Sequence, residues 1–480
     1  MLEKNEKYIS DIVRKVVDEF VQKGFAGETK SYSHTTFTSV KNGVFENVED
    51  AVRSAKEAQK IWVDLPKNTK EKIINALRIS MHENAEEFSK RALAETGMGR
   101  LKDKIAKHHN AADSTPGLED LETRSWSGDK GLVYEDYAPY GVVAAITPST
   151  HPVPVLLNSL IIITAAGNSV VFNVHPAAKK VSAYAIEIFN EVIVRNGGPQ
   201  NLACLLREPT LESADKLFRH PDIKLICATG GPGLVKAAFE SGKKVIAAGP
   251  GNPPVLVDET ADLKKAAEII IEGASFDNNI LCIAEKEVFV VDSVFERFMI
   301  EMENAGAVRL QKSQIENLLP HVFLQNKNGS VSVNRDFIGK NANVLGRAIG
   351  LNLSDDVRIL FGECPFECPF VQEEQMMPYL PIVRVKDFTE GLELSKKAEH
   401  GYGHTAMIHS NNLGNITKFT KVMDTSIVVV NGSCLTGNGG AAGEGYFSHT
   451  IASPTGEGVC TPRNFARVRR LSINKSLQMK

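Results

Sequence analysis

The chain has 480 residues, of which 42% are hydrophobic and 24% are charged, and its formal net charge is −3. A chain of this length exceeds one compact core, so we expect a globular protein of two or three domains. The small net charge and the lack of a basic block exclude electrostatic support for a nucleic-acid partner. The most apolar run, "VPVLLNSLIIITAAG", contains polar residues and is shorter than the roughly 20 residues of a membrane span, so we expect a buried helix and no membrane association.

Residues 1–24 form the first predicted element. In "YISDIVRKVVDEFVQKG" the apolar residues follow the i, i+3, i+4, i+7 spacing of one helical stripe, with charges on the opposite face. Gly24 can end this helix, and a polar segment rich in Thr and Ser follows as a linker. Two interpretations are open: the helix packs on its own domain, or it docks as a tag in a groove of a partner.

The middle of the chain has the pattern of an α/β protein. Residues 48–112 are predicted to be helical, and from residue 140 onward short apolar strands alternate with helices. This alternation indicates doubly wound parallel sheets, which bind ligands beyond the carboxyl ends of their strands. We predict two α/β domains with a cleft between them. The predicted strands are "GVVAAITP", "SVVFNV", "NLACLL", "IKLICATG" and "KKVIAAG", and then a second series from "PPVLVD" to "SIVVVNG".

The sequence contains a glycine-rich segment and seven cysteines. "TGNGGAAGEG" matches a dinucleotide fingerprint only nominally, because no convincing helix and acidic ribose partner follow, so we expect a loop. The odd number of cysteines and the lack of an evident secretory signal favour a reducing, cytoplasmic compartment with free thiols. Cys364 and Cys368 are four residues apart, but no second ligand pair has the spacing of a zinc site, and we predict no metal.

Cys282 is the candidate nucleophile. The segment "SFDNNILCIAEKEV", residues 275–288, places it behind two asparagines at the mouth of a predicted strand. A cysteine that meets a substrate requires access and polar neighbours, because the thiolate is the reactive form, whereas a core cysteine requires neither. We therefore expect the asparagines to mark an open approach to the thiol.

Six segments, in the same order along the chain, resemble those of the aldehyde dehydrogenase superfamily. More narrowly they resemble its CoA-acylating branch, the propionaldehyde and acetaldehyde dehydrogenases of bacterial microcompartments. The segments are "AAITPSTHP", "FNVHPAAKK", "ATGGPGLVK", "SFDNNILCIAEKEV", "EEQMMPYLPIVRV" and "IASPTGEGVCTPRNFARVRR". The resemblance implies an NAD-binding α/β domain over residues 25–120 and 139–250, with part of the C-terminal region, and a catalytic α/β domain over 251–435 that carries the nucleophilic cysteine. It also implies a small β oligomerisation arm from 121–138 and 450–480, in a homodimer or homotetramer.

The resemblance also implies a reaction. Cys282 attacks the carbonyl of a short-chain aldehyde, the oxyanion collapses by hydride transfer to NAD⁺, and the thioacyl group passes to coenzyme A. The backbone N–H of Cys282 is one expected oxyanion donor. Thr150 takes the place of the asparagine that supplies the second donor in hydrolytic relatives. It is alternatively a helix N-cap before Pro152, and both roles are compatible.

The residues expected at the NAD site follow from the same resemblance. Glu374 matches the carboxylate that accepts hydrogen bonds from the nicotinamide ribose, and His175 replaces a lysine that grips the adenosine ribose. A neutral histidine binds a 2′-phosphate poorly, which favours NAD over NADP. The remaining expected contacts are the strand-to-helix turn and the helix N-terminus near the pyrophosphate, namely Thr147, Pro148, Ser149, Thr229, Gly230, Gly231 and Leu234.

One departure from the family indicates which acceptor takes the acyl group. Hydrolytic members carry a glutamate that activates water, and alignment of "AAGPGNPP" puts Ala248 at that position. Without a general base, attack by water should slow by roughly 10²–10⁴-fold, whereas a CoA thiolate needs none. We expect formation of an acyl-CoA, from propionaldehyde by resemblance, and residues 1–20 as a tag for a microcompartment shell protein. The alternatives are a hydrolytic enzyme that recruits another base and a non-catalytic, nucleotide-binding protein of the shell.

Overall fold

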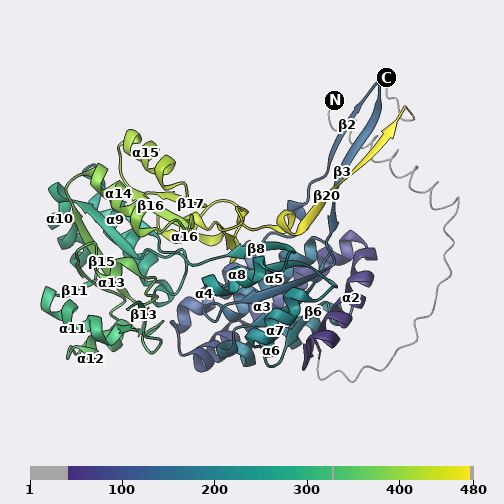
Figure 1. Ribbon diagram of the computed structural model, residues 1–480, viewed down its shortest axis with the longest axis horizontal. Helices are drawn as coiled ribbons and strands as arrows, with labels where there is room; N and C mark the ends of the chain where they lie inside the picture. The colour runs from purple at the N-terminus through teal and green to yellow at the C-terminus, as the bar shows by residue number, and fades with distance from the viewer. Residues whose placement is uncertain (1–41, 327–328, 476–480) are drawn as a thin grey trace. The chain divides into compact units, whose positions relative to one another are not determined.

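The structure is a computed structural model that describes residues 42–326 and 329–475. The predicted amphipathic helix over residues 1–24 and the linker after it lie outside this part of the chain. The described residues build two parallel sheets with helices on their faces, a three-stranded antiparallel ribbon and two short two-stranded sheets (Figure 1). The prediction of two doubly wound α/β regions is therefore confirmed. Among the described helices, none has the length and apolar character that a membrane span requires.

The first sheet lies between two layers of helices. Every residue of its strand Val142–Thr147 is buried, as expected for a parallel strand covered on both faces. Val143 and Ala145 belong to the core on one face, and Val142 and Ala144 belong to the core on the other. In spatial order the strands are β1 (Val44–Phe45), β6 (Ala203–Leu206), β5 (Ser169–Val174), β4 (Val142–Thr147), β7 (Ile223–Thr229) and β8 (Lys244–Ala248). The helices of this region are α2 (Val48–Asp64), α3 (Lys67–Thr96), α4 (Leu101–Ser114), α5 (Pro152–Ala165), α6 (Lys179–Arg195), α7 (Leu211–Arg219) and α8 (Pro232–Phe239).

The second sheet is also parallel and has its own large core. In spatial order its strands are β11 (Val308–Arg309), β14 (Leu360–Glu363), β15 (Tyr379–Val385), β10 (Glu287–Val291), β9 (Pro254–Val257), β16 (Thr405–His409) and β17 (Ile427–Val430). Its helices are α9 (Leu263–Ser275), α10 (Asp292–Asn304), α11 (Lys312–Val322), α12 (Ala342–Ala348), α13 (Pro369–Gln372), α14 (Phe388–Ala398), α15 (Leu413–Met423) and α16 (Cys434–Gly437). The strands and helices predicted from residue 140 onward are confirmed, because each overlaps an element of these two sheets.

Three antiparallel strands form a ribbon (Figure 1). They are β2 (Arg124–Gly128), β3 (Gly131–Pro139) and β20 (Ala466–Asn474), and β3 pairs with both others. The short pairs are β12 (Phe323–Gln325) with β13 (Val331–Val333), and β18 (Ile451–Ala452) with β19 (Gly458–Val459). The ribbon draws on both segments expected to form the oligomerisation arm. Its role in oligomerisation and the predicted domain boundaries remain predictions.

Candidate active site

Cys282 lies where two cavities meet. The larger cavity, of about 620 Å³, is lined by residues at the carboxyl ends of β4, β5, β7 and β8. The smaller one, of about 150 Å³, is lined mainly by residues of α4, of the segment around Cys282 and of residues 435–451. Four residues line both cavities, namely His151, Cys282, His449 and Ile451. A group bound to the sulfur of Cys282 can therefore be approached from two sides.

The loop before Cys282 has an unusual backbone. Asp277, Asn278 and Asn279 have φ values of 47°, 57° and 65°, in the left-handed region that asparagine and aspartate tolerate best. Both asparagines are buried, and their side chains hydrogen-bond protein atoms: Asn278 donates to the carbonyl of Gly339 and Asn279 to those of Ala274 and Glu285. The expectation that they mark an open approach is wrong, since they shape the backbone and line neither cavity.

The position of Cys282 relative to the sheet also differs from the expectation. Residues 276–279 form a short 3-10 turn, and Cys282 follows in a turn five residues before β10 begins at Glu287. The sequence predicts a strand beginning at Cys282, but Leu281, Ile283 and Ala284 pack in the core of the second sheet without joining the sheet. The cysteine therefore stands on a loop held by side chains.

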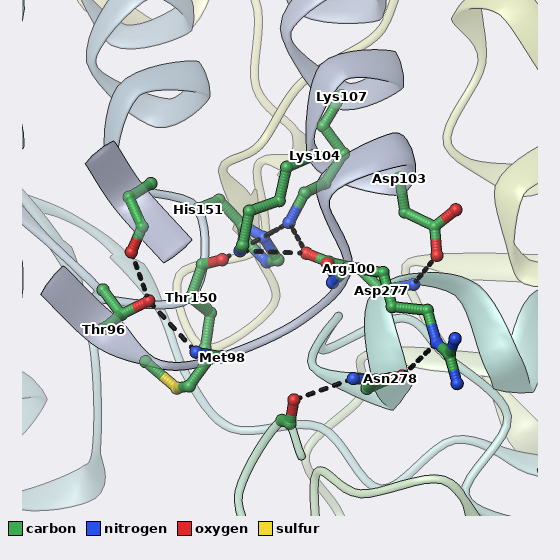
Figure 2. A network of polar contacts seen from close by, with 12 residues as sticks. Thr96, Met98, Arg100, Asp103, Lys104, Lys107, Thr150, His151, Asp277 and Asn278 are labelled. Carbon is green, nitrogen blue, oxygen red and sulfur yellow. Dashed lines mark hydrogen bonds and ion pairs between the residues drawn. The ribbon is translucent and has the colours of Figure 1, made fainter. Parts of the chain in front are cut away.

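A buried ion cluster supports this loop (Figure 2). The carboxylate of Asp277 accepts hydrogen bonds from the ammonium groups of Lys107 and of Lys104, the latter at 3.3 Å, and from the backbone N–H of Arg100 at 2.7 Å. Burial alone would raise the pKa of Asp277, but the two ammonium groups hold it below its usual value. The aspartate is therefore ionised, and α4 is tied to the loop. Both lysines belong to α4, whereas Asp277 follows α9 in the chain.

The surroundings of Cys282 favour the protonated thiol. Of the seven cysteines, all of which the structure describes, Cys282 alone is not buried. Desolvation, followed by the carboxylate of Glu374, raises its pKa to about 12, against the opposing effect of Lys286 and of nearby backbone N–H groups. The pKa of Glu374 is itself raised to about 7 by burial. At neutral pH the sulfur is thus mainly a thiol, and the reactive thiolate is a minor form.

The structure brings all the predicted site residues together. Thr150 and Cys282 line the larger cavity, and so do the nine residues expected at the cofactor. Those nine are Thr147, Pro148, Ser149, His175, Thr229, Gly230, Gly231, Leu234 and Glu374. Their individual roles remain predictions.

Two features of the larger cavity fit a dinucleotide. The hydroxyl of Thr147 is buried and has no hydrogen-bond partner among the described residues. Helix α8 begins at Pro232, after Gly231, without a side-chain cap, and a Cβ added at Gly231 would meet nothing within 4 Å. Pro232 has no N–H and the N–H groups of Leu234 and Val235 bond the carbonyl of Gly231, which leaves the N–H groups of Gly231 and Gly233 for a ligand. Free N–H groups at a helix N-terminus bind phosphate, and an unpaired hydroxyl can bind a polar ligand.

The N-cap alternative for Thr150 is wrong. Helix α5 begins at Pro152 and its N-cap is His151, whose side chain makes no capping hydrogen bond. Proline at the first helical position fixes the cap one residue before it. The carbonyl of Thr150 instead accepts a hydrogen bond from Lys107 at 3.3 Å. The hydroxyl of Thr150 is therefore not used as a cap.

Apart from Cys282, the residues of the smaller cavity were not predicted as site residues from the sequence. Its polar wall includes Lys107, Asn110, His151, Asn438 and His449. Asn438 comes from the glycine-rich segment that we expected to be a plain loop, and this segment forms short turns at the cavity. Only His151 gave a usable signal, because it directly follows Thr150 in the predicted strand-to-helix turn. Within the described residues, no group of three or more His, Cys, Asp or Glu side chains is arranged to hold a metal ion.

The model of the aldehyde dehydrogenase family matches residues 25–446. The chain belongs to the aldehyde dehydrogenase family. It is 46% identical over 455 residues to the acetylating acetaldehyde dehydrogenase EutE of Salmonella typhimurium, covering 94% of this chain and 97% of the relative. It is 42% identical over 444 residues to the CoA-propanoylating propanal dehydrogenase of Citrobacter freundii, covering 92% and 94% of the two chains.

Solved structures of this aldehyde dehydrogenase branch share the fold. A propionaldehyde dehydrogenase from the fucose utilisation microcompartment of Clostridium phytofermentans aligns with a TM-score of 0.89 and 44% identity, covering 92% of this chain and all of that one. The propionaldehyde dehydrogenase of Rhodopseudomonas palustris, with bound CoA and an acylated cysteine, aligns with a TM-score of 0.88 and 39% identity over 92% and 100%. An engineered glycolyl-CoA reductase with bound NADP⁺ gives 0.89 and 39% over the same shares. The resemblance to the CoA-acylating branch and the aldehyde dehydrogenase-like fold are confirmed.

Proposed function

We propose that this aldehyde dehydrogenase oxidises a short-chain aldehyde to its acyl-CoA, with NAD⁺ as hydride acceptor and a thioacyl intermediate on Cys282. The observation that carries the proposal is that, among the described residues, the larger cavity has no second carboxylate to act as a general base. Ala248, at the end of β8, lines the larger cavity where hydrolytic members have a glutamate. Among the described residues that line this cavity, Glu374 is the only carboxylate, and it is expected to bind the cofactor ribose. A thiol acceptor removes the need for a base.

The chain's own groups account for the chemical steps. The reactive form of Cys282 is the thiolate, which forms when the thiol loses its proton to solvent. This thiolate bonds to the carbonyl carbon while the C=O electron pair moves to oxygen, and the N–H of Cys282 and the hydroxyl of Thr150 stabilise that oxyanion. The dinucleotide supplies hydride acceptance when it is bound. Collapse of the oxyanion leaves a thioester on Cys282. The CoA thiolate then attacks this thioester and Cys282 leaves as a thiolate, so acyl-CoA is released and the sulfur is regenerated.

The smaller cavity supports a short aldehyde chain. It holds about 150 Å³, and its apolar wall includes Phe276, Leu281, Ile283, Leu435 and Phe447. We therefore propose propionaldehyde as the substrate. For localisation we propose a cytoplasmic microcompartment, with residues 1–20 as the tag that binds a shell protein. This part rests on the resemblance and on the microcompartment origin of a structural relative.

Sustained NADH formation from propionaldehyde and NAD⁺ is expected only when CoA is present. Without CoA we expect at most one NADH per active site, because position 248 carries no carboxylate to activate water for attack on the thioester. Stopped-flow absorbance at the NADH band, followed into the steady state, measures both phases. Equal steady-state rates with and without CoA would mean that water deacylates the enzyme and would contradict the proposal.

The variant Ala248→Glu provides the matched test. A carboxylate at this point of the cavity can activate water, so turnover without CoA should rise by about ten- to a hundredfold over the parent chain. Free propionate should accumulate in proportion to NADH. Unchanged CoA dependence in a folded variant would show that position 248 does not decide the acceptor.

Dinucleotide affinity is expected to depend on pH through Glu374. The carboxylate accepts hydrogen bonds from the ribose hydroxyls. When it is protonated, one of its oxygens becomes a donor and can no longer accept a hydrogen bond from a hydroxyl in the same way. Because burial raises the pKa of Glu374 to about 7, affinity should be present at pH 8 and fall as pH decreases through 7, by about tenfold at pH 6. Titration calorimetry of NAD⁺ at both pH values measures this change. The variant Glu374→Gln should bind more weakly and show no such pH dependence.

NADP⁺ is the second candidate cofactor because of Arg335. This exposed arginine lines the larger cavity, and its charge acts together with burial to lower the pKa of His175. A guanidinium suits a 2′-phosphate, whereas neutral histidine does not. The same calorimetry with NADP⁺ separates the two cofactors. Tenfold tighter binding of NADP⁺ would replace NAD⁺ in the proposal.

We also propose that the ribbon joins copies of the chain into a dimer or a tetramer. Three large apolar side chains on it are exposed: Trp126 by 50%, Val468 by 66% and Leu471 by 55%. Val468 and Leu471 are three residues apart in β20 and therefore lie on opposite faces of the ribbon, so both faces carry exposed apolar surface of the kind that interfaces bury. Replacing Val468 and Leu471 with serine should shift the species seen by light scattering after size exclusion toward monomer. Val194→Ser, an exposed apolar position on α6, should leave the mass unchanged.

A further inference from the structure

The hydrogen-bonding state of His151 is fixed by Lys107. The ammonium of Lys107 lies 2.8 Å from Nδ1 of His151 and also donates to Asp277 and to the carbonyl of Thr150 (Figure 2). An ammonium has three donors and no acceptor, and these three partners use all of them. Nδ1 of His151 must therefore accept. A neutral imidazole with an accepting Nδ1 carries its proton on Nε2, so Nε2–H is a donor.

The surroundings keep this imidazole neutral. His151 is 6% exposed, and burial, followed by the charge of Lys107, lowers its pKa well below the usual value. The titratable and charged groups around it are Lys104, Lys107, Lys286 and His449. The ring of His449 stacks on it, with centroids 5.4 Å apart, and burial lowers the pKa of His449 to about 3. Because the site is buried and the nearby charges are positive, His151 is neutral at pH 7.

The Nε2–H donor of His151 has no protein partner. In residues 42–326 and 329–475, the hydrogen bond to Lys107 is the one this side chain makes. Nε2 of His151 is not one of the fully buried polar atoms without a partner, so it remains accessible at the cavity surface. The ring lines both cavities, as Cys282 does. A nine-tenths buried side chain thus presents an unused donor at the junction where the reacting carbonyl must lie.

We propose that His151 is a catalytic residue whose Nε2–H donates a hydrogen bond to the carbonyl oxygen as Cys282 attacks, and that Lys107 is the positioning residue that fixes its tautomer. The thiolate of Cys282, whose proton has passed to solvent, forms the sulfur–carbon bond, the C=O electron pair moves to oxygen, and no proton leaves His151. A neutral imidazole polarises a carbonyl in this way in other enzymes. The inference rests on the proposed role of Cys282 but not on CoA as the acceptor.

Acylation of Cys282 by p-nitrophenyl propionate tests the proposal without NAD⁺ or CoA. Release of nitrophenolate passes through the same kind of oxyanion. His151→Phe and His151→Asn both remove the Nε2 donor, while asparagine keeps an acceptor for Lys107. We expect each to slow the nitrophenolate burst by roughly 10²–10³-fold, and His151→Gln, whose amide reaches the Nε2 position, to stay within about tenfold of the parent chain. A burst rate of the asparagine variant within about fivefold of that of the parent chain would overturn the proposal.

Alkylation of the same sulfur provides the internal control. Iodoacetamide reacts with Cys282 by displacement and forms no oxyanion, so its rate at pH 9 should change by less than threefold in all three variants. A parallel loss of acylation and alkylation would mean that His151 acts on the thiol or on the fold, and would overturn the proposal. Because neither reaction uses CoA, hydrolytic turnover in the steady-state assay would defeat the proposed function and leave this result intact.

The ratio of acylation to alkylation also tests Lys107. In Lys107→Met nothing donates to Nδ1, so His151 can also carry its proton there and lose the Nε2–H donor. The ratio of the acylation rate to the alkylation rate should therefore fall by about tenfold, even if a weakened fold lowers both rates. Lys107→Arg restores a donor to Nδ1 and should recover most of the ratio. An unchanged ratio in Lys107→Met would overturn the positioning role.

Discussion

Replacement of Cys282 by alanine is expected to lower the rate of aldehyde oxidation by roughly 10⁴-fold or more, because no covalent intermediate can form. The other six cysteines are buried and lie outside both cavities. The steady-state rate of NADH formation with CoA measures the loss. Cys204→Ala, at a fully buried cysteine of the first sheet, should retain activity within about twofold at a temperature where it is folded.

Two further readouts separate loss of chemistry from loss of structure. NAD⁺ affinity of Cys282→Ala, measured by calorimetry, should stay within about threefold of the parent chain, since the cofactor contacts remain. In the parent chain the rate of alkylation should rise through pH 10 without a plateau near 8.5, because the pKa of the thiol is about 12. Residual activity above one per cent in the alanine variant would mean that another group carries the reaction.

Asp277→Ala is expected to lower the apparent free energy of unfolding by about 3–5 kcal/mol, because it leaves buried ammonium groups without their counter-ion. Lys104 and Lys107 are buried with it, and burial lowers the pKa of Lys107 to about 8 even with the aspartate present. Without Asp277 this pKa should fall further, and proton release should offset part of the loss. The midpoint of urea unfolding, followed by fluorescence and circular dichroism, measures the effect.

A surface ion pair provides the control for Asp277. Asp222 pairs with Lys56 at 2.7 Å with both side chains substantially exposed, so Asp222→Ala should cost at most about 1 kcal/mol. The double variant Asp277→Ala with Lys107→Met should be less unstable than the sum of the two single variants, because it removes one of the stranded charges. A loss below about 1 kcal/mol for Asp277→Ala would contradict the structural importance of the cluster.

The sequence was sufficient for features that leave a local pattern. The buried strand Val142–Thr147 is apolar at nearly every position, and helices and strands alternate from there in a way that a parallel sheet requires. The site residues at strand ends followed, because carboxyl ends of parallel strands meet at one edge. The resemblance to the family then assigned the role of nucleophile to Cys282 and of ribose binding to Glu374. The position of the N-cap was also within reach, since Pro152 at the first helical position points to His151.

Long-range polar contacts could not be predicted from the sequence. Lys107 precedes Asp277 by 170 residues, and a single buried charge has no periodicity that a sequence could display. The two asparagines before Cys282 misled for the same reason: their polar character indicated solvent, whereas their partners are the carbonyls of Gly339, Ala274 and Glu285. A buried amide whose hydrogen bonds are complete is indistinguishable, in one sequence, from an exposed amide.

The left-handed turn at Asp277, Asn278 and Asn279 has a consequence for the exchange of parts between relatives. The turn belongs to the region of the second sheet, but the groups that hold its carboxylate come from Arg100, Lys104 and Lys107, in or next to α4 of the first. A chimera that joins the cofactor half of one relative to the catalytic half of another inherits the nucleophile without its anchor unless α4 matches the new turn. Recombination points that keep residues 100–107 and 276–282 from the same parent should give active hybrids.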